Sequence, residues 1–221
     1  MKTFSLLLIV ALAAIATGCH ELAGQLHGSG KRIVEKREIG DFKSLSTEGA
    51  FEIRIACQKS PSLEIEGDDN ILPAIRTTVS NGVLHVKSLR GYRSSEPILI
   101  RLTVNNLEAL SVSGAGRIDI EGVNSEQFKI DSSGAPTIKV SGAAKMVDID
   151  SSGAAKIDTH KLQASRAVVE SSGVSKIDLD VKDQLDVTIS GPSTVTYKGD
   201  PVVKKTINGP GKLEKKASEG A

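Results

Sequence analysis

The chain has 221 residues and nearly balanced charge, with 28 Lys and Arg against 27 Asp and Glu and a formal net charge of +1. This balance argues against a nucleic acid or a strongly anionic surface as the partner. Tryptophan is absent, and only four phenylalanines and two tyrosines are present. Aromatic platforms of the kind that sugar and peptide sites use are therefore scarce.

Residues 1–18 have the pattern of a signal peptide. A basic residue, Lys2, precedes an apolar stretch at residues 6–15 that is too short to span a membrane. The small residues Ala16-Thr17-Gly18 followed by Cys19 resemble a bacterial lipobox. In a lipobox, Cys19 would be acylated on its sulfur and, after cleavage behind Gly18, on its new amino group. An ordinary secretory cleavage site with an incidental cysteine is the alternative.

An acylated Cys19 predicts a lipoprotein of the bacterial cell envelope, because several acyl chains together make a stable membrane anchor. His20 rather than Asp follows the cysteine, which favours sorting to the outer membrane. Residues 19–31 are expected to form a polar linker between the lipid and the folded domain. The only other cysteine, Cys57, shares a strand face with Ile53 and Ile55, so we expect it to be buried and free of any intramolecular disulfide.

Residues 32–106 are strand-like but irregular. Alternation of apolar and polar residues predicts strands at 51–56, 63–66, 83–87 and 98–104, with a turn at Ser80-Asn81-Gly82. Between two of these strands, residues 89–95 form a polar loop in which Tyr92 is flanked by Arg90 and Arg93. These three residues are a speculative binding site. The competing interpretation is a plain connection in which Tyr92 caps the core.

From residue 107 the chain repeats. Glycines in small-residue turns recur at spacings of 20, 19, 20, 18 and 18, at Gly114, Gly134, Gly153, Gly173, Gly191 and Gly209. The residues four before and four after each glycine are aliphatic, apart from Lys205. The residues between them alternate in the manner of half-buried strands. Each repeat therefore predicts two short strands separated by turns, with a glycine that tolerates positive φ at the centre of one corner.

A repeat this short cannot bury a hydrophobic face alone, so neighbouring copies must stack and share one core. The sequence thus predicts an all-β fold, a right-handed parallel β-helix or solenoid with about 18–20 residues per rung and irregular N-terminal rungs. We expect one domain at residues 32–216, irregular over 32–106 and regular over 107–216, followed by a short tail at 217–221. A separate small β domain with a boundary near Asn105 is the alternative.

Stacking turns the charged residues beside the glycines into ladders. Asp131, Asp150 and Glu170 each lie three positions before a glycine, and Lys156 and Lys176 lie three after. The carboxylates are expected to be solvated, to pair with these lysines across the corner, or to be bridged by calcium. The Gly-Gly-x-Gly-x-Asp calcium repeat is missing, so no metal site is assigned.

Catalytic signals are weak. His85 is expected to be a solvated strand residue, and no partner for His160 is evident. Nucleophile motifs, phosphate-binding loops and zinc spacings are absent, and rungs of 18–20 residues leave little chain for the walls of a deep cleft. We therefore expect no enzyme and no cofactor. Lysines at 204–205 and 212–216 are expected to protect the last strand edge from pairing, which favours a monomer.

The ordered sequence resembles the putative autotransporter adhesin head GIN domain family. The resemblance covers nearly the whole mature chain and rests on Phe42-Lys43-Ser44-Leu45 before Gly49-Ala50-Phe51, on residues 63–70 (LEIEGDDN), on residues 81–86 (NGVLHV), and on residues 107–110 before Ser113-Gly114-Ala115-Gly116. It implies a β-helical bacterial surface or periplasmic domain, often lipid-anchored, with no catalytic residues to carry over.

These observations together predict a non-catalytic cell-envelope lipoprotein whose β-solenoid binds a protein or glycan ligand, or acts as a scaffold. Two alternatives remain open. One is a polysaccharide-active hydrolase or lyase, which a deep groove with clustered carboxylates and bases would support. The other is a purely structural envelope protein whose rods join end to end.

Overall fold

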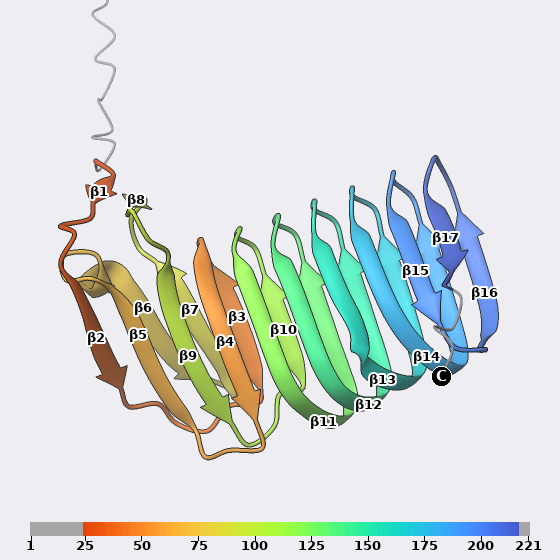
Figure 1. Cartoon of the computed structure of the whole chain (residues 1–221), viewed down its shortest axis with the longest axis horizontal. Coiled ribbons are helices and arrows are strands. Elements are labelled where there is room, and N and C mark those ends of the chain that lie inside the picture. Colours follow the sequence, from red (N-terminus) through yellow and green to blue (C-terminus); the bar gives the residue numbers. More distant parts are fainter. Residues whose placement is uncertain (1–23, 217–221) are drawn as a thin grey trace, which may run out of the picture.

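The computed structural model describes residues 24–216. Strands make up this part of the chain, together with one short 3-10 turn, η1 (Leu72–Ala74). Figure 1 shows the strands stacked side by side along one long axis. Within residues 24–216, no helix is long and apolar enough to cross a membrane. The expected signal peptide, the lipidation site Cys19 and the tail at 217–221 lie outside the described residues.

The regular part of the chain forms parallel rungs. Its strands are β10 (Ala109–Val112), β11 (Arg117–Ser132), β12 (Thr137–Ser151), β13 (Lys156–Ser171), β14 (Lys176–Ile189), β15 (Thr194–Lys198), β16 (Val202–Ile207) and β17 (Lys212–Lys215). Every pairing among them is parallel. The aliphatic residues four positions after the glycines meet in register, as Ile118 with Ile138 and Ile157 with Ile177. The parallel stacking of rungs at the glycine spacing is confirmed.

The prediction of two short strands per rung is wrong for the central rungs. Strands β11 to β14 are 14 to 16 residues long, and each continues from one glycine corner, around a bend, to the next corner. The register shifts at these bends, for example between Ile120 and Val123 of β11. Local bulges therefore turn the chain while hydrogen bonding to the neighbouring rungs resumes on both sides. The segments before the bends form a first wall of the solenoid, and those after the bends form a second wall.

The N-terminal strands are irregular rungs of the same solenoid. Strand β4 (Phe51–Cys57) pairs with β11 and β9 (Ile98–Val104), while β3 (Ser44–Glu48) pairs with β10 and β7 (Val83–Ser88), all in parallel. Three antiparallel strands end the stack, namely β2 (Arg32–Arg37), β5 (Ser62–Asp68) and β6 (Ile75–Ser80). The expected turn joins β6 to β7, with positive φ at Asn81 (52°) and Gly82 (74°), as a tight hairpin requires.

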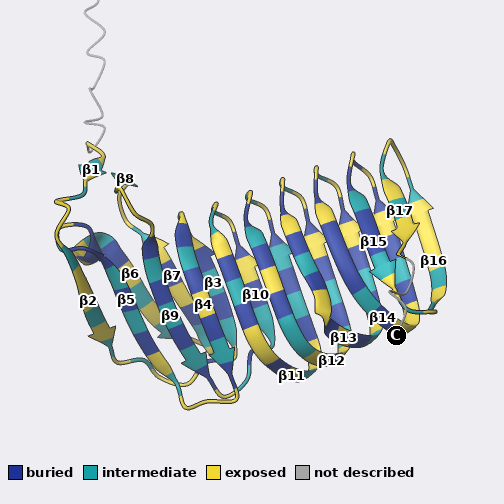
Figure 2. Cartoon of the chain, in the orientation of Figure 1, coloured by how far each residue is buried: buried dark blue, intermediate teal, exposed yellow. Residues whose placement is uncertain are grey.

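The core lies between the two walls and runs the length of the stack. Figure 2 shows the alternation of buried and exposed residues along each strand. Ile53, Ile130 and Ile157 are fully buried, as the apolar periodicity predicts. Cys57 is 5% exposed and free, which confirms its assignment as a small buried residue. Burial raises the pKa of its thiol by desolvation, so it is a poor nucleophile.

Glycine occupies the corners for a different reason from the one expected. Positive φ is found at Gly209 (137°), but Gly114, Gly134, Gly153, Gly173 and Gly191 do not have it. Instead, a Cβ at Gly134 would lie 1.9 Å from the carbonyl oxygen of Gly114. That oxygen accepts a hydrogen bond from the N–H of Ala135, 3.1 Å away. Glycine is therefore required because successive corners stack backbone on backbone with no room for a side chain.

Buried serines line the inside of these corners. The Ser151 and Ser175 hydroxyl oxygens lie 2.7 Å apart, as do those of Ser171 and Ser193. The serine two positions before one glycine thus meets the serine two positions after the next. Ser132 has no partner within the described residues, because the matching position is Ala155. Since Ser175 Oγ and Ser193 Oγ also accept backbone N–H groups, the paired serines satisfy polar groups that the corners would otherwise bury.

The substitution Gly134→Ala tests the corner contact. The added methyl group would meet backbone rather than a movable side chain, so we expect a loss of at least about 2 kcal/mol in the free energy of unfolding. Chemical denaturation measures this loss. The matched control is Gly40→Ala, where nothing lies within 4 Å of the added Cβ and little change is expected. Equal stability of the two variants would show that the corner can relax.

Candidate functional site

The three residues proposed from sequence lie against the chain's N-terminal segment. Tyr92 and Arg93 form β8 (Tyr92–Arg93), which pairs in parallel with β1 (Leu26–His27). The Tyr92 ring stacks on Phe51 with 6.5 Å between ring centroids, and its hydroxyl donates a hydrogen bond to the Ala50 carbonyl. Arg90 donates to the Gly24 carbonyl at 3.0 Å. Arg90 and Tyr92 thus each make an internal contact, and Arg93 lies exposed beside them.

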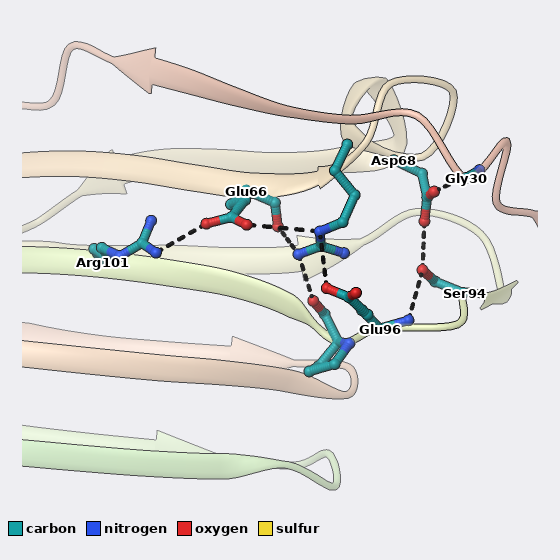
Figure 3. A network of polar contacts seen from close by, with 8 residues as sticks. Gly30, Glu66, Asp68, Ser94, Glu96 and Arg101 are labelled. Carbon is teal, nitrogen blue, oxygen red and sulfur yellow. Dashed lines mark hydrogen bonds and ion pairs between the residues drawn. The ribbon is translucent and has the colours of Figure 1, made fainter.

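A polar network beside this loop holds the same N-terminal segment (Figure 3). Asp68 is 1% exposed and accepts hydrogen bonds from the Gly30 N–H, at 2.8 Å, and from the Ser94 hydroxyl. Asn70 follows on the same segment and donates to the His27 carbonyl at 2.8 Å. Asp68 and Asn70, at the end of the LEIEGDDN segment, therefore fasten the incoming chain to the first rung.

Arg32 and Arg101 complete the network through Glu66. Arg101 donates to Glu66 at 2.8 Å, and this bond is the main reason that the pKa of the Glu66 carboxyl is lowered. Arg32 lies 3.6 Å from Glu66 and 3.3 Å from Glu96, and it also donates to the Pro97 carbonyl at 3.0 Å. No sequence motif marks this network; the one local signal is the polar run Asp68-Asp69-Asn70 at the end of β5.

The buried position of Tyr92 predicts a late ionisation. Desolvation raises the pKa of Tyr92 to about 12, from an ordinary value of 10.0. The pKa of Tyr92 is therefore higher in the folded protein than in the unfolded one. Its contribution to the free energy of unfolding is fully present below pH 10 and is lost as the pH rises from 10 to 12. In a Tyr197→Phe background, an ultraviolet titration reports Tyr92 alone, and we expect its midpoint near 12. A midpoint near 10 would place the ring in solvent.

A long groove crosses the bends of successive rungs. Its volume is about 1300 Å³, and it extends from the rung of Asn106 to the loop containing Gly199 and Asp200. We call it the bend groove. Its lining residues include Asn124, Ser125, Gln127, Ala143, Ala144, Gln163, Ala164, Ser165 and Val181. No sequence pattern pointed to it, because the bends carry no repeated motif and absorb the variation in repeat length.

Two columns of side chains define the bend groove. In the first, Asn124, Ala143, Gln163 and Asp180 pair in register from rung to rung. In the second, Ser125, Ala144, Ala164 and Val181 do the same. The alanines of the second column and Val181 are buried, whereas the residues of the first column are exposed or partly exposed. A floor of small side chains thus lies beside a row of larger, mostly polar ones.

Most of the charged side chains around the groove take part in ion pairs. The lining contains three lysines and four carboxylates. Glu126 pairs with Lys145 at 2.8 Å, Glu108 with Lys43 at 3.0 Å, and Asp200 with Lys215 at 2.5 Å. The centre of the groove is therefore polar but close to neutral, with amide and hydroxyl groups free to donate and accept hydrogen bonds.

A second hollow, of about 740 Å³, lies on the first wall, with Arg54, Lys139 and Asp158 in its lining. His160 also lies here and contacts Asp158 through Nδ1, so the expectation that it has no evident partner is wrong. This contact and the nearby Lys139 lower the pKa of the Asp158 carboxyl, although burial opposes them. His85 is exposed between buried neighbours, as predicted.

The acidic ladder is present but is paired differently from the expectation. Asp131, Asp150 and Glu170 lie in register on the second wall. Asp131 pairs with Lys129 on its own strand at 3.3 Å, and this contact raises the pKa of Lys129. Across residues 24–216, neither Lys156 nor Lys176 forms an ion pair with the ladder, because both lie on the first wall. The same residues include no group of three His, Cys, Asp or Glu side chains placed to hold a metal ion.

Comparisons with known proteins agree on one kind of fold. A family model described as "Putative auto-transporter adhesin, head GIN domain" matches residues 41–201. No curated protein matches the chain. A putative adhesin from Bacteroides fragilis has a similar crystal structure, with a TM-score of 0.72, 21% identity, and coverage of 86% of this chain and 99% of that one.

Two further solved structures share the fold. A putative adhesin from Parabacteroides merdae matches with a TM-score of 0.54, 18% identity, and coverage of 87% of this chain and 99% of that chain. One from Parabacteroides distasonis matches with a TM-score of 0.52, 17% identity, and coverage of 87% and 100%. Identities this low establish the architecture and leave the ligand to be argued from this chain's own residues.

Proposed function

Since the chain belongs to the putative auto-transporter adhesin head GIN domain family, we propose that it is an adhesin-like binding protein of the bacterial envelope that uses the bend groove to hold an extended ligand. The family implies a surface or envelope location. We further propose that an acylated Cys19 holds the protein on the outer membrane. The small residues Ala16-Thr17-Gly18 directly before Cys19 support this anchor, because they resemble a lipobox.

The observation that carries the proposal is the continuity of the bend groove. It crosses five inter-rung steps, each roughly 4.8 Å, and so extends over about 24 Å. A shallow trough of this length suits a polymer that lies along the rod better than a small molecule, which a cavity encloses on most sides. The groove has walls of short side chains and no long loops, as expected for short rungs.

The pairing of the groove carboxylates supports a non-catalytic role. Glycoside hydrolysis uses two carboxyl groups that face each other across the scissile bond, one of which must give up a proton. Three of the four groove carboxylates, Glu108, Glu126 and Asp200, are instead each engaged by a lysine. A lysine partner favours the ionised carboxylate and so opposes the acid role. A hydrolase or lyase remains the alternative, and it would release shorter products from a bound polysaccharide.

Charge at the C-terminal end supports a monomer over rods joined end to end. There, β16 carries Lys204 and Lys205 with no acidic residue. The basic residues of the N-terminal edge strand β2 are instead paired, Arg32 with Glu66, Lys36 with Glu64 and Arg37 with Glu35. Lysines on an exposed edge disfavour pairing with a strand of another molecule.

Blocking the bend groove should reduce binding to envelope material. The substitution Ala143→Arg places a long charged side chain in the groove, and it is made in a Cys19→Ser background so that lipid plays no part. We expect binding to an immobilised envelope extract to weaken by about tenfold or more, as for the loss of one good contact. The matched control, Ala154→Arg, makes the same change at an exposed corner outside the groove. Equal binding by both variants would move the ligand site elsewhere.

The anchor is tested separately. We expect the wild-type protein to fractionate with outer membranes and to carry the mass of its acyl chains on Cys19, whereas Cys19→Ser should be soluble after secretion. Cell fractionation and mass spectrometry measure both properties. A Cys19→Ser protein that stays with the membrane would show that another feature holds it there.

A further inference from the structure

The bend groove has a repeat of its own, set by the rungs. Its first column stacks Asn124 on Ala143, and Ala143 on Gln163, in register. The Asn106 side chain continues this column and accepts a hydrogen bond from the Asn124 N–H at 3.4 Å. Each rung therefore offers one side chain at a regular step of roughly 4.8 Å. A polymer whose units advance by nearly this step can place one unit beside every rung.

We propose that the bend groove binds a neutral, extended glycan with one sugar ring on each rung; this inference rests on the proposed binding function. A pyranose ring in an extended β-1,4-linked chain advances by nearly one rung spacing, and successive rings present alternate faces to the groove. The five steps of the groove then accommodate about six rings.

The chemistry of the two columns fits a sugar ring. A pyranose presents C–H groups on its faces and hydroxyl groups around its rim. The exposed Ala143 offers a methyl group to a ring face, and the buried Ala144 and Ala164 beside it leave the floor free of bulky side chains. The amides of Asn124 and Gln163 both donate and accept, as the rim hydroxyls do.

Ser125 adds a polar group without a partner. Its hydroxyl oxygen is shielded and makes no hydrogen bond within the described residues, although the residue lines the groove. An unpaired hydroxyl in such a place is costly, and a ligand hydroxyl would relieve that cost after rotation of the side chain. It lies at the start of the floor column, directly beside Ala144.

Charge favours a neutral glycan over an acidic one. The central lysine of the groove, Lys145, is already paired with Glu126 at 2.8 Å. The lining as a whole has one more carboxylate than lysine. A uronate or phosphate on every ring would meet no array of free cations, so the groove offers an acidic glycan no charge complementarity.

An extended peptide fits the groove less well. Its residues advance by about 3.3 Å each and so fall out of step with the rungs. Peptides that bind to sheets also need an unpaired strand edge. Strands β12 and β13 are hydrogen-bonded to a neighbouring rung on either side of the groove floor, so no such edge is available there.

The absence of an aromatic platform has a consequence for affinity. No Phe or Tyr lines the groove, so each ring gains little on its own. Affinity must then come from the number of rungs occupied. We expect it to rise with each added sugar ring and to level off at about six rings, when the groove is full.

Calorimetric titration of the secreted Cys19→Ser protein with β-1,4-linked cello-, manno-, xylo- and chito-oligosaccharides of two to six rings tests the proposal. We expect at least one series to bind with an affinity that rises with length. Gln163→Ala should weaken the six-ring ligand about fivefold, the loss of one hydrogen bond. Ala143→Arg should abolish binding, and Ala154→Arg should leave it unchanged.

The results that would contradict the glycan assignment differ from those that would contradict the proposed binding function. Failure of all four neutral series, affinity independent of length, or stronger binding of an oligogalacturonate would overturn the glycan assignment. If Ala143→Arg still reduces capture of envelope material in that case, the proposed binding function stands with another ligand. Release of shorter oligosaccharides from the bound ligand would contradict the non-catalytic proposal instead, and chromatography of the titration mixture detects it.

Discussion

The stacking of one glycine corner on the next is the contact on which the rest of this structure depends. The carbonyls of Gly114, Gly134 and Gly153 each accept an N–H from the next corner, and Gly134, Gly153 and Gly173 lie too close to the preceding corner to leave space for a Cβ. Because the backbone itself makes the contact, the register of both walls is set at every corner. The aliphatic residues on either side of a corner then enter the core in register with those of the neighbouring rung.

The same constraint explains where the molecule can recognise a ligand. A corner packed backbone on backbone has no side chains to offer, and the strand faces carry charges that are largely paired with their neighbours. The bends are different, because they absorb the changes in rung length. Asn124, Ala143 and Gln163 stack there without repeating a motif. The binding surface is therefore an open trough along the rod, and its period is that of the rungs.

The N-terminal end has a separate role. Asp68, Asn70 and Tyr92 hold residues 24–31, through which the chain enters the domain, against the first rung.

The sequence by itself determined the rungs, because Ile118, Ile138 and Ile157 recur at a fixed distance from glycines and leave only one way to share a core. It also showed that Cys57 is buried, since alternation alone places it on an apolar face. Only the tertiary structure decided why the glycines are there, because the clash at Gly134 is with Gly114, 20 residues earlier. The bend groove was hidden for a related reason. Its side chains come from segments of unequal length, and the sheet register, which no local pattern encodes, brings them into line.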